Sequence, residues 1–300
     1  MIHIQSHGPV TAIRLARTFL GRPIAWTAAY WLDGLLIDSG PPCLAGQLLA
    51  GLGSLPVEQI VVTHPHEEQC GGLARLRDRF PHAQMYAPFT GLPLVQEPHR
   101  LRPSFLRRLL WGMPEGVARV EPLDVFIETD RYRLRVIDTP GHCRAHVSLF
   151  EPHNRWLFSG DAFNADRERA WSAEAEMFGT ISSLRTLAAL RPERLFPASG
   201  NVRRTPLPEL HGKIGQLLGL CREVGKLHSA GLPTGEIVRR LLGGEPSLYY
   251  WSLGTFSAHN LARACLAYNE LFQPVADGAN EKRRPLEQRP NSRISSSSPE

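Results

Sequence analysis

The first forty residues of the chain show the apolar pattern of β structure. Apolar positions dominate residues 27–32 and 35–37, and Asp33-Gly34 between them is typical of a two-residue hairpin turn. Further apolar or β-branched runs predict strands at 58–62, 83–87, 131–138, 147–150, 155–159 and 194–196. Helices are predicted at 43–52, in the segment that ends at Phe80, and at 180–190. The alternation indicates a mixed α and β fold.

The segment 88–116 interrupts this pattern. It is rich in proline and arginine, and residues 105–111 form its one predicted helical piece. An insertion of this length inside a compact domain is often a lid or a segment that contacts substrate.

The β pattern stops after Arg204. Helices are predicted at 207–228, 235–242 and 258–272, with Thr234 and Ser257 at the N-cap positions of the last two. From residue 273 the chain is proline, serine, asparagine and charge, which predicts a disordered tail. We therefore divide the chain into residues 1–204, a helical cap at 205–272, and the tail at 273–300.

Composition excludes several classes of protein. The chain has 300 residues, of which 42% are hydrophobic and 21% charged, as is ordinary for a globular protein. A surplus of five basic side chains is too small to indicate a nucleic-acid partner, and no apolar run is long enough to cross a membrane. The N-terminus has no export-signal pattern, and the five cysteines form no CxxC pair. We expect a cytoplasmic protein with free thiols.

Polar side chains able to bind a metal follow four of the apolar strands. The four segments are residues 60–69, 136–142, 157–161 and 195–200. Loops that follow strands at one edge of a sheet can point at a common centre.

Four side chains in these loops form a candidate metal site. His64 and His66 are one residue apart, so an extended loop directs both rings to the same side. His142 follows Pro140-Gly141, and Asp161 follows Gly160. Three imidazoles and a carboxylate suit Zn²⁺, with Fe²⁺ or Mn²⁺ as further options. Such a cation lowers the pKa of a bound water to about 7.

These motifs resemble those of the metallo-β-lactamase superfamily. The stretch THPHEEQCGG at 63–72 is similar to the family signature THxHxDHxGG, and Asp38, the 139–142 loop and Asp161 fall in the family's order. The resemblance covers about residues 12–204. It implies an α+β fold, a four-layer αββα sandwich, with the metal site at the edge of two facing sheets.

The chain departs from the family at three positions. Glu68 and Gln69 replace an aspartate and a histidine, and Ser199 replaces the usual histidine of the last loop. In the family those three side chains build a second metal position. We therefore expect one tightly held metal per chain and a second position that is weak or vacant.

Several side chains have two interpretations. Glu68 is predicted to relay a proton as the catalytic acid or base, or else it is an ordinary acid at a helix start. His146 either orients a metal ligand or is a core histidine. The arginines at 100, 102, 107 and 108 are interpreted as a solvated helix face, with contact to an acidic substrate as the alternative.

The sequence thus predicts a metal-dependent hydrolase of a small molecule. Metal-bound hydroxide would attack an ester-like carbonyl, with a thioester favoured over a β-lactam, and the helical cap would cover the cleft. Two other functions stay open: a regulatory protein that has lost catalysis on the same fold, and a mononuclear iron oxygenase. The oligomeric state is not indicated by the sequence.

Overall fold

The first of two β-sheets is built largely from the N-terminal half of the chain. The computed structural model describes residues 1–101, 105–164 and 168–272, and the predicted tail at 273–300 lies outside them. The sheet runs in the order β1 (Ile2–His7), β2 (Val10–Phe19), β3 (Arg22–Leu32), β4 (Leu35–Ile37), β5 (Gln59–Val61), β6 (Gln84–Ala87) and β7 (Val120–Pro122). Its first four strands are antiparallel, and β4 to β7 are parallel.

The predicted hairpin turn is confirmed between β3 and β4. Asp33 and Gly34 both have positive φ, 49° and 84°, which is the left-handed geometry that a two-residue hairpin turn requires. The turn fixes the register that pairs Leu32 with Leu35 and Tyr30 with Ile37.

The second sheet contains the later strands. Its order is β12 (Arg194–Pro197), β11 (Trp156–Gly160), β10 (Val147–Glu151), β9 (Arg133–Asp138) and β8 (Phe126–Glu128). Only the pairing of β11 with β12 is parallel, because the chain crosses over between them through a helix. Both β10 and β11 are buried along their whole length.

The two sheets face each other across an apolar interior. Tyr30 of β3 packs edge-on against Phe158 and Phe196 of the second sheet, and its hydroxyl donates a 2.6 Å hydrogen bond to the carbonyl of Pro197. Tyr30 is 2% exposed, so this hydrogen bond lies inside the sandwich.

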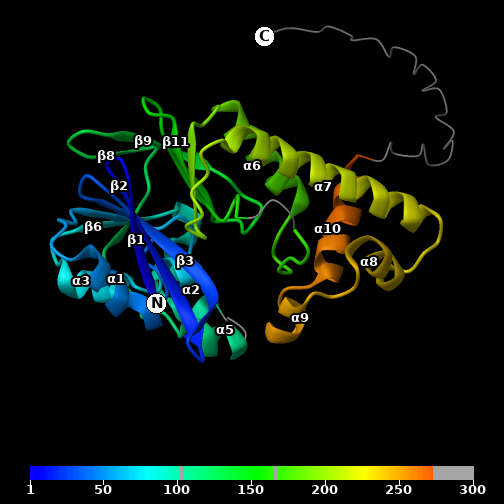
Figure 1. The fold of residues 1–300 in the computed structure, drawn as a ribbon, viewed down its shortest axis with the longest axis horizontal. Coiled ribbons are helices and arrows are strands. Elements are labelled where there is room, and N and C mark those ends of the chain that lie inside the picture. Colours follow the sequence, from blue (N-terminus) through cyan, green and yellow to red (C-terminus); the bar gives the residue numbers. More distant parts are fainter. Residues whose placement is uncertain (102–104, 165–167, 273–300) are drawn as a thin grey trace, which may run out of the picture.

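Helices cover both outer faces (Figure 1). On the first sheet lie α1 (Ala45–Leu52), α2 (Glu67–Cys70), α3 (Leu73–Arg79), α4 (Leu92–Gln96) and α5 (Phe105–Trp111). On the second lies α6 (Met177–Ala189), against which α7 (Pro206–Ser229) and α10 (Ala258–Leu271) pack, and apolar side chains of the three helices form one cluster with that sheet. The α+β, four-layer αββα architecture predicted from the sequence is confirmed.

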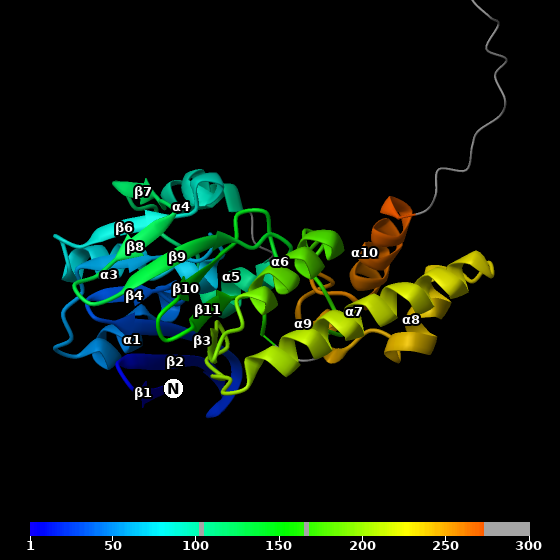
Figure 2. The ribbon, with the colours of Figure 1, turned by 90° about the horizontal axis from the view of Figure 1, so that it is seen from above.

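The C-terminal helices extend to one side of the sandwich (Figure 2). They are α7, α8 (Thr234–Leu242), α9 (Ser247–Trp251) and α10. Ser257 caps α10 as predicted, because its side chain accepts from the backbone N–H groups of His259 and Asn260. Among the described residues, no helix has the length and apolar character that a bilayer crossing demands.

Three details of the sequence prediction are wrong. Thr234 is the first residue of α8 and does not cap it, since Pro233 occupies the N-cap position. The segment 88–116 contains more than one helical piece, because η2 (Phe89–Gly91), α4 and η3 (Pro98–Leu101) precede α5. The short strands β7 and β8 were not predicted, since three-residue strands with exposed positions carry little periodic signal.

Candidate metal centre

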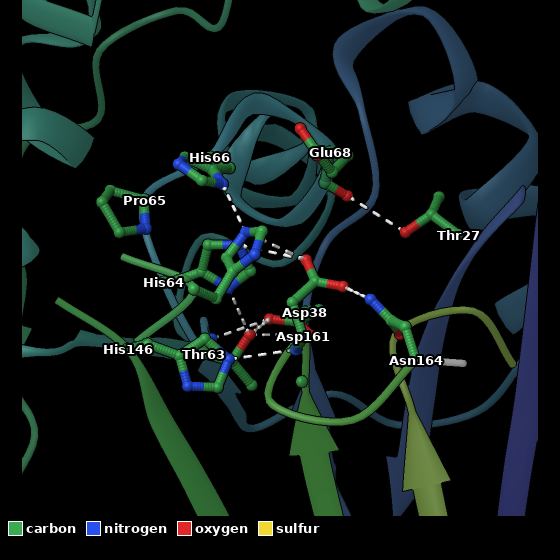
Figure 3. A network of polar contacts seen from close by, with 12 residues as sticks. Thr27, Asp38, Thr63, His64, Pro65, His66, Glu68, His146, Asp161 and Asn164 are labelled. Carbon is green, nitrogen blue, oxygen red and sulfur yellow. Dashed lines mark hydrogen bonds and ion pairs between the residues drawn. The ribbon is translucent and has the colours of Figure 1, made fainter. Parts of the chain in front are cut away.

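The candidate ligands come together in loops that follow strands at one edge of the sandwich. His64 and His66 follow β5, and Asp161 directly follows β11 (Figure 3). His142 follows β9. The ligand atoms of the three histidines all lie within 4.8 Å of one another. His66 Nδ1 and His142 Nε2 are 3.0 Å apart, and the His64 ring centroid lies 4.7 Å and 4.9 Å from the other two.

His64 is held by a buried chain of hydrogen bonds. Asp38 accepts from the backbone N–H of Thr63 at 2.7 Å and lies 3.1 Å from its hydroxyl, which in turn is 3.1 Å from His64 Nδ1. Burial raises the pKa of Asp38 to about 8, and the Thr63 hydrogen bonds oppose the rise. Above that pKa Asp38 is ionised and only accepts, so the Thr63 hydroxyl donates to Asp38, accepts the Nδ1 proton of His64 and leaves the Nε2 lone pair free.

The Nε2 atom of His64 is buried and aimed into the centre. It lies 3.3 Å from Asp161 Oδ2 but has no hydrogen bond of acceptable geometry within the described residues. Burial lowers the pKa of His64 to about 3, although Asp161 opposes the effect. A neutral imidazole with a free, buried lone pair is well suited to bind a metal ion.

His66 is oriented by Glu174, which precedes α6. His66 Nε2 lies 2.9 Å from Glu174 Oε1, and a carboxylate there selects the tautomer that carries its proton on Nε2. The lone pair of His66 is then on Nδ1, the atom that faces His142. Carboxylate partners of this kind fix the ring of metal-binding histidines.

Asp161 is fixed from both ends. Its backbone N–H donates to His146 Nε2 at 3.0 Å, and its Oδ1 accepts from the side-chain amide of Asn164. Its Oδ2 faces the imidazoles, 3.6 Å from His142 Nε2. Burial alone would raise the pKa of Asp161, but His142 and His64 outweigh it and hold the pKa well below its usual value.

His146 is a core histidine that orients the Asp161 loop. Its Nδ1 lies 2.8 Å from the hydroxyl of Thr139, while its Nε2 accepts from Asp161. Gly160 has φ of 49°, and a Cβ there would lie 2.7 Å from His146 Nε2, so the loop needs glycine to turn so close to the ring.

The His142 loop is docked on the start of α6. Gly141 has φ of 140°, and a Cβ at this position would lie 2.4 Å from the backbone nitrogen of Thr180. The Gly141 carbonyl accepts from the backbone N–H of Glu176 at 2.7 Å, and the Pro140 carbonyl accepts from Ser183 at 2.7 Å. Burial is the main reason that the pKa of His142 is lowered to about 4.

Beside the histidines lies an arginine corner, which we define as Arg107, Glu67 and Glu68. Arg107 Nε is 2.5 Å from Glu67 Oε1, and its terminal nitrogen is 2.6 Å from Glu68 Oε2. Arg107 is only 12% exposed, so the interpretation as a solvated helix face is wrong for this residue. Burial raises the pKa of Glu68, and Arg107 opposes the rise.

The other two replaced positions are also enclosed. Gln69 Oε1 and Ser199 Oγ are buried, and neither has a hydrogen-bond partner within the described residues. The backbone N–H of Ser199 donates to Asn164, which links this loop to Asp161.

A cavity of about 210 Å³ adjoins His142 and Asp161. Lys213 of α7, Leu248 of α9 and Phe256 line it from the C-terminal segment, and Trp171 lines it from the loop before α6. Lys213 is 2% exposed and pairs with Glu168. The C-terminal helices therefore contribute directly to the wall of the space beside the histidines.

Sequence reasoning missed Glu174 and Asn164, and it placed Arg107 on a solvated helix face. Glu174 is 108 residues from His66 and stands in no motif. Asn164 lies three residues after Asp161, and that proximity was the one signal available for it. Arg107 sits in a seven-residue helix that is too short to show which side faces inward.

The donor set fits a divalent cation. His64 Nε2, His66 Nδ1 and His142 Nε2 converge, two of these tautomers are set by carboxylate-linked hydrogen bonds, and His64 Nε2 has no other hydrogen bond in the described part of the chain. Imidazole and carboxylate donors in this number suit a four-coordinate or five-coordinate metal.

Comparison with known proteins places these features in one family. The profile described as the metallo-beta-lactamase superfamily matches residues 29–199. A hydroxyacylglutathione hydrolase from Aeromonas hydrophila subsp. hydrophila is 29% identical over 218 residues, covering 70% of this chain and 74% of that protein. A beta-lactamase-like protein 2 homolog from Caenorhabditis elegans is 26% identical and covers 56% of this chain, which spans about half (52%) of that relative.

Solved structures share the fold. A metallo-beta-lactamase family protein from Thermus thermophilus superposes with a TM-score of 0.64 at 18% identity, covering 88% of this chain and 93% of that one. A metallo-beta-lactamase from Pseudomonas aeruginosa in its mono-zinc form gives a TM-score of 0.56 at 14% identity, covering 72% and 94%. The profile match ends at residue 199, before α7, and the division of the chain at residue 204 stays a prediction.

Proposed function

Because the chain belongs to the metallo-beta-lactamase superfamily, we propose that it is a metal-dependent hydrolase of a thioester or related ester-like bond in a small molecule. The observation that carries the proposal is the convergence of three imidazoles whose ligand atoms lie within 4.8 Å of one another. The similarity to a hydroxyacylglutathione hydrolase favours a thioester within that class.

His64, His66 and His142 would hold the metal, with Asp161 Oδ2 facing it as the fourth protein ligand. Zn²⁺ suits this donor set, and Fe²⁺ or Mn²⁺ are alternatives. When bound, the cation supplies Lewis-acid polarisation of a carbonyl and lowers the pKa of a bound water to about 7.

The chain's own residues would bind the substrate and move the proton. Glu68 is held through Oε2 by Arg107, so Oε1 is the atom through which it would accept a proton during hydrolysis. The cavity beside His142 would take the acyl portion, and Trp171 and Phe256 would exclude water from the reacting bond. The C-terminal segment would set specificity, because it supplies part of that wall.

A panel of substrates tests the proposal. Purified, zinc-loaded protein is assayed with hydroxyacylglutathione and acyl-coenzyme A thioesters by release of free thiol, with an aryl ester and a β-lactam alongside. We expect thioester hydrolysis that EDTA and His66→Ala abolish and that His153→Ala, on the exposed β10–β11 turn, leaves unchanged.

Other outcomes would overturn the proposal. A stably metallated protein that hydrolyses none of these compounds would favour a binding or regulatory role on the same fold. Oxygen uptake by the iron-loaded protein, in the absence of hydrolysis, would favour an oxygenase.

A further inference from the structure

Arg107 reaches the candidate metal centre from an inserted segment. It lies on α5, about forty residues from the glutamates that it contacts, and its side chain is 12% exposed. Its guanidinium carbon also lies 5.8 Å from the ring of Phe256, in the C-terminal segment. Thus one side chain contacts the helix after His66 and the segment that lines the cavity.

The two glutamates need a cation to remain buried. Glu67 is 2% exposed and Glu68 is 17% exposed, and they are adjacent in the chain on the same short helix. Buried carboxylates persist when they are paired with a cation or coordinate a metal. Both receive a charged hydrogen bond from Arg107, at 2.5 Å and 2.6 Å.

Glu67 and Glu68 lie close to the candidate metal centre, so it matters whether a second metal ion or a side chain neutralises them. Glu68 is two residues from His66, and the charge of Asp161 acts on it as well. A divalent metal beside Glu68 would therefore be an immediate neighbour of the ion at the histidines. A fixed guanidinium supplies positive charge at this place while occupying Glu68 Oε2, one of the two oxygens with which Glu68 would coordinate such a metal.

We propose that Arg107 acts as a built-in replacement for a second metal ion: it neutralises Glu67 and Glu68, withholds Oε2 of Glu68 from coordination, and limits the centre to one cation. This inference rests on the proposed function in one respect, since it assumes that the histidines bind a metal. Arg107 is a positioning residue, because it acts through Glu68 and not on the substrate.

Metal counting tests the proposal without any assay of activity. The full chain is titrated with Co²⁺ and with Zn²⁺, and bound metal per chain is measured by equilibrium dialysis and, for Co²⁺, by visible absorption. The variants are Arg107→Met, Arg107→Lys, and Arg108→Met as a matched exposed neighbour on α5. We expect one equivalent in the wild type and in R108M, and a second, weaker equivalent in R107M.

A double variant identifies the ligand of that second ion. Adding Glu68→Gln to Arg107→Met should return the count to one, because a neutral amide oxygen is a poorer ligand than a carboxylate. R107K should keep one equivalent, since an ammonium retains the charge although it cannot contact both glutamates as a planar fork does.

The possible failures are distinguishable. No bound metal in the wild type would overturn the proposed function together with this inference. One equivalent in both the wild type and folded R107M would overturn the inference alone. If R107M does not fold, the wild type still decides: a second equivalent bound at micromolar Co²⁺ would show that Arg107 does not limit the count.

Discussion

Two neighbouring regions of this protein treat charge in opposite ways. In the histidine corner, defined as His64, His66, His142 and Asp161, three imidazoles converge, burial lowers the pKa of His64 and His142, and His64 Nε2 has no hydrogen bond within the described residues. In the arginine corner, two carboxylates already have their cation, supplied by Arg107. The histidine corner therefore has donor atoms suited to a metal ion, whereas the carboxylates of the arginine corner are already neutralised by a side chain of the protein.

This difference supports the inference that the centre binds one metal ion and not two. A neutral imidazole remains buried at modest cost, whereas two adjacent buried carboxylates need a positive charge beside them. A guanidinium on a nearby helix meets that need permanently and at every metal concentration. Of the three replaced positions, Glu68 is the one that Arg107 contacts, so these two side chains form one structural unit.

The largest expected effect is loss of the histidine corner itself. His142→Ala removes one of three converging donors, so metal affinity should fall by more than the ~10–100-fold that loss of an outer hydrogen-bond partner costs. Bound zinc per chain after dialysis measures it, with His153→Ala as the control. Retention of one tightly bound equivalent in H142A would contradict the assignment of His142.

A smaller effect is expected from the hydrogen bonds behind His64. Thr63→Val keeps the shape of the side chain but breaks the link between Asp38 and His64 Nδ1. We expect metal binding ~10–100-fold weaker, measured by competition with a chromophoric chelator. Thr186→Val on the exposed side of α6 is the matched control. Equal affinity in T63V and wild type would show that His64 needs no such support.

Glu174 offers a graded version of the same test. It is 54% exposed, so Glu174→Ala should weaken metal binding by about tenfold, at the low end for such partners. Glu174→Gln retains an acceptor for the Nε2 proton of His66 and should lose less. If both variants bind metal as tightly as the wild type does, the carboxylate of Glu174 does not set the His66 tautomer.

The smallest effect on the metal is expected from Tyr30. Tyr30→Phe removes the buried hydrogen bond to the Pro197 carbonyl and should lower the free energy of unfolding by about 1–2 kcal/mol. Urea unfolding measures it, with Tyr86→Phe, whose hydroxyl contacts exposed Gln84, as the control. Metal stoichiometry should not change. A changed stoichiometry would show that sandwich packing, and not local hydrogen bonding, governs the histidine corner.

The sequence predicted the fold and the candidate ligands because both are expressed locally. Strands appear as short apolar runs, and His64-Pro65-His66 and Asp161 stand in motifs directly after them. The pairing partners are not local. Glu174 meets His66, and Arg107 meets Glu67 and Glu68, only after distant segments have docked. No periodic pattern in the sequence encodes which arginine of a proline-rich insertion turns inward.

Gly141 has a consequence that reaches beyond the imidazole it precedes. The Gly141 peptide, which precedes His142, packs against the first turn of α6 and is hydrogen-bonded to it. Helix α6 in turn packs against α7, whose Lys213 lines the cavity. The position of the His142 ring and the shape of the cavity wall therefore both depend on α6. A substitution that tilts α6 to admit a bulkier compound would also displace the third imidazole, so new specificities should arise by changing side chains on α7 and α9 while leaving the helix axes in place.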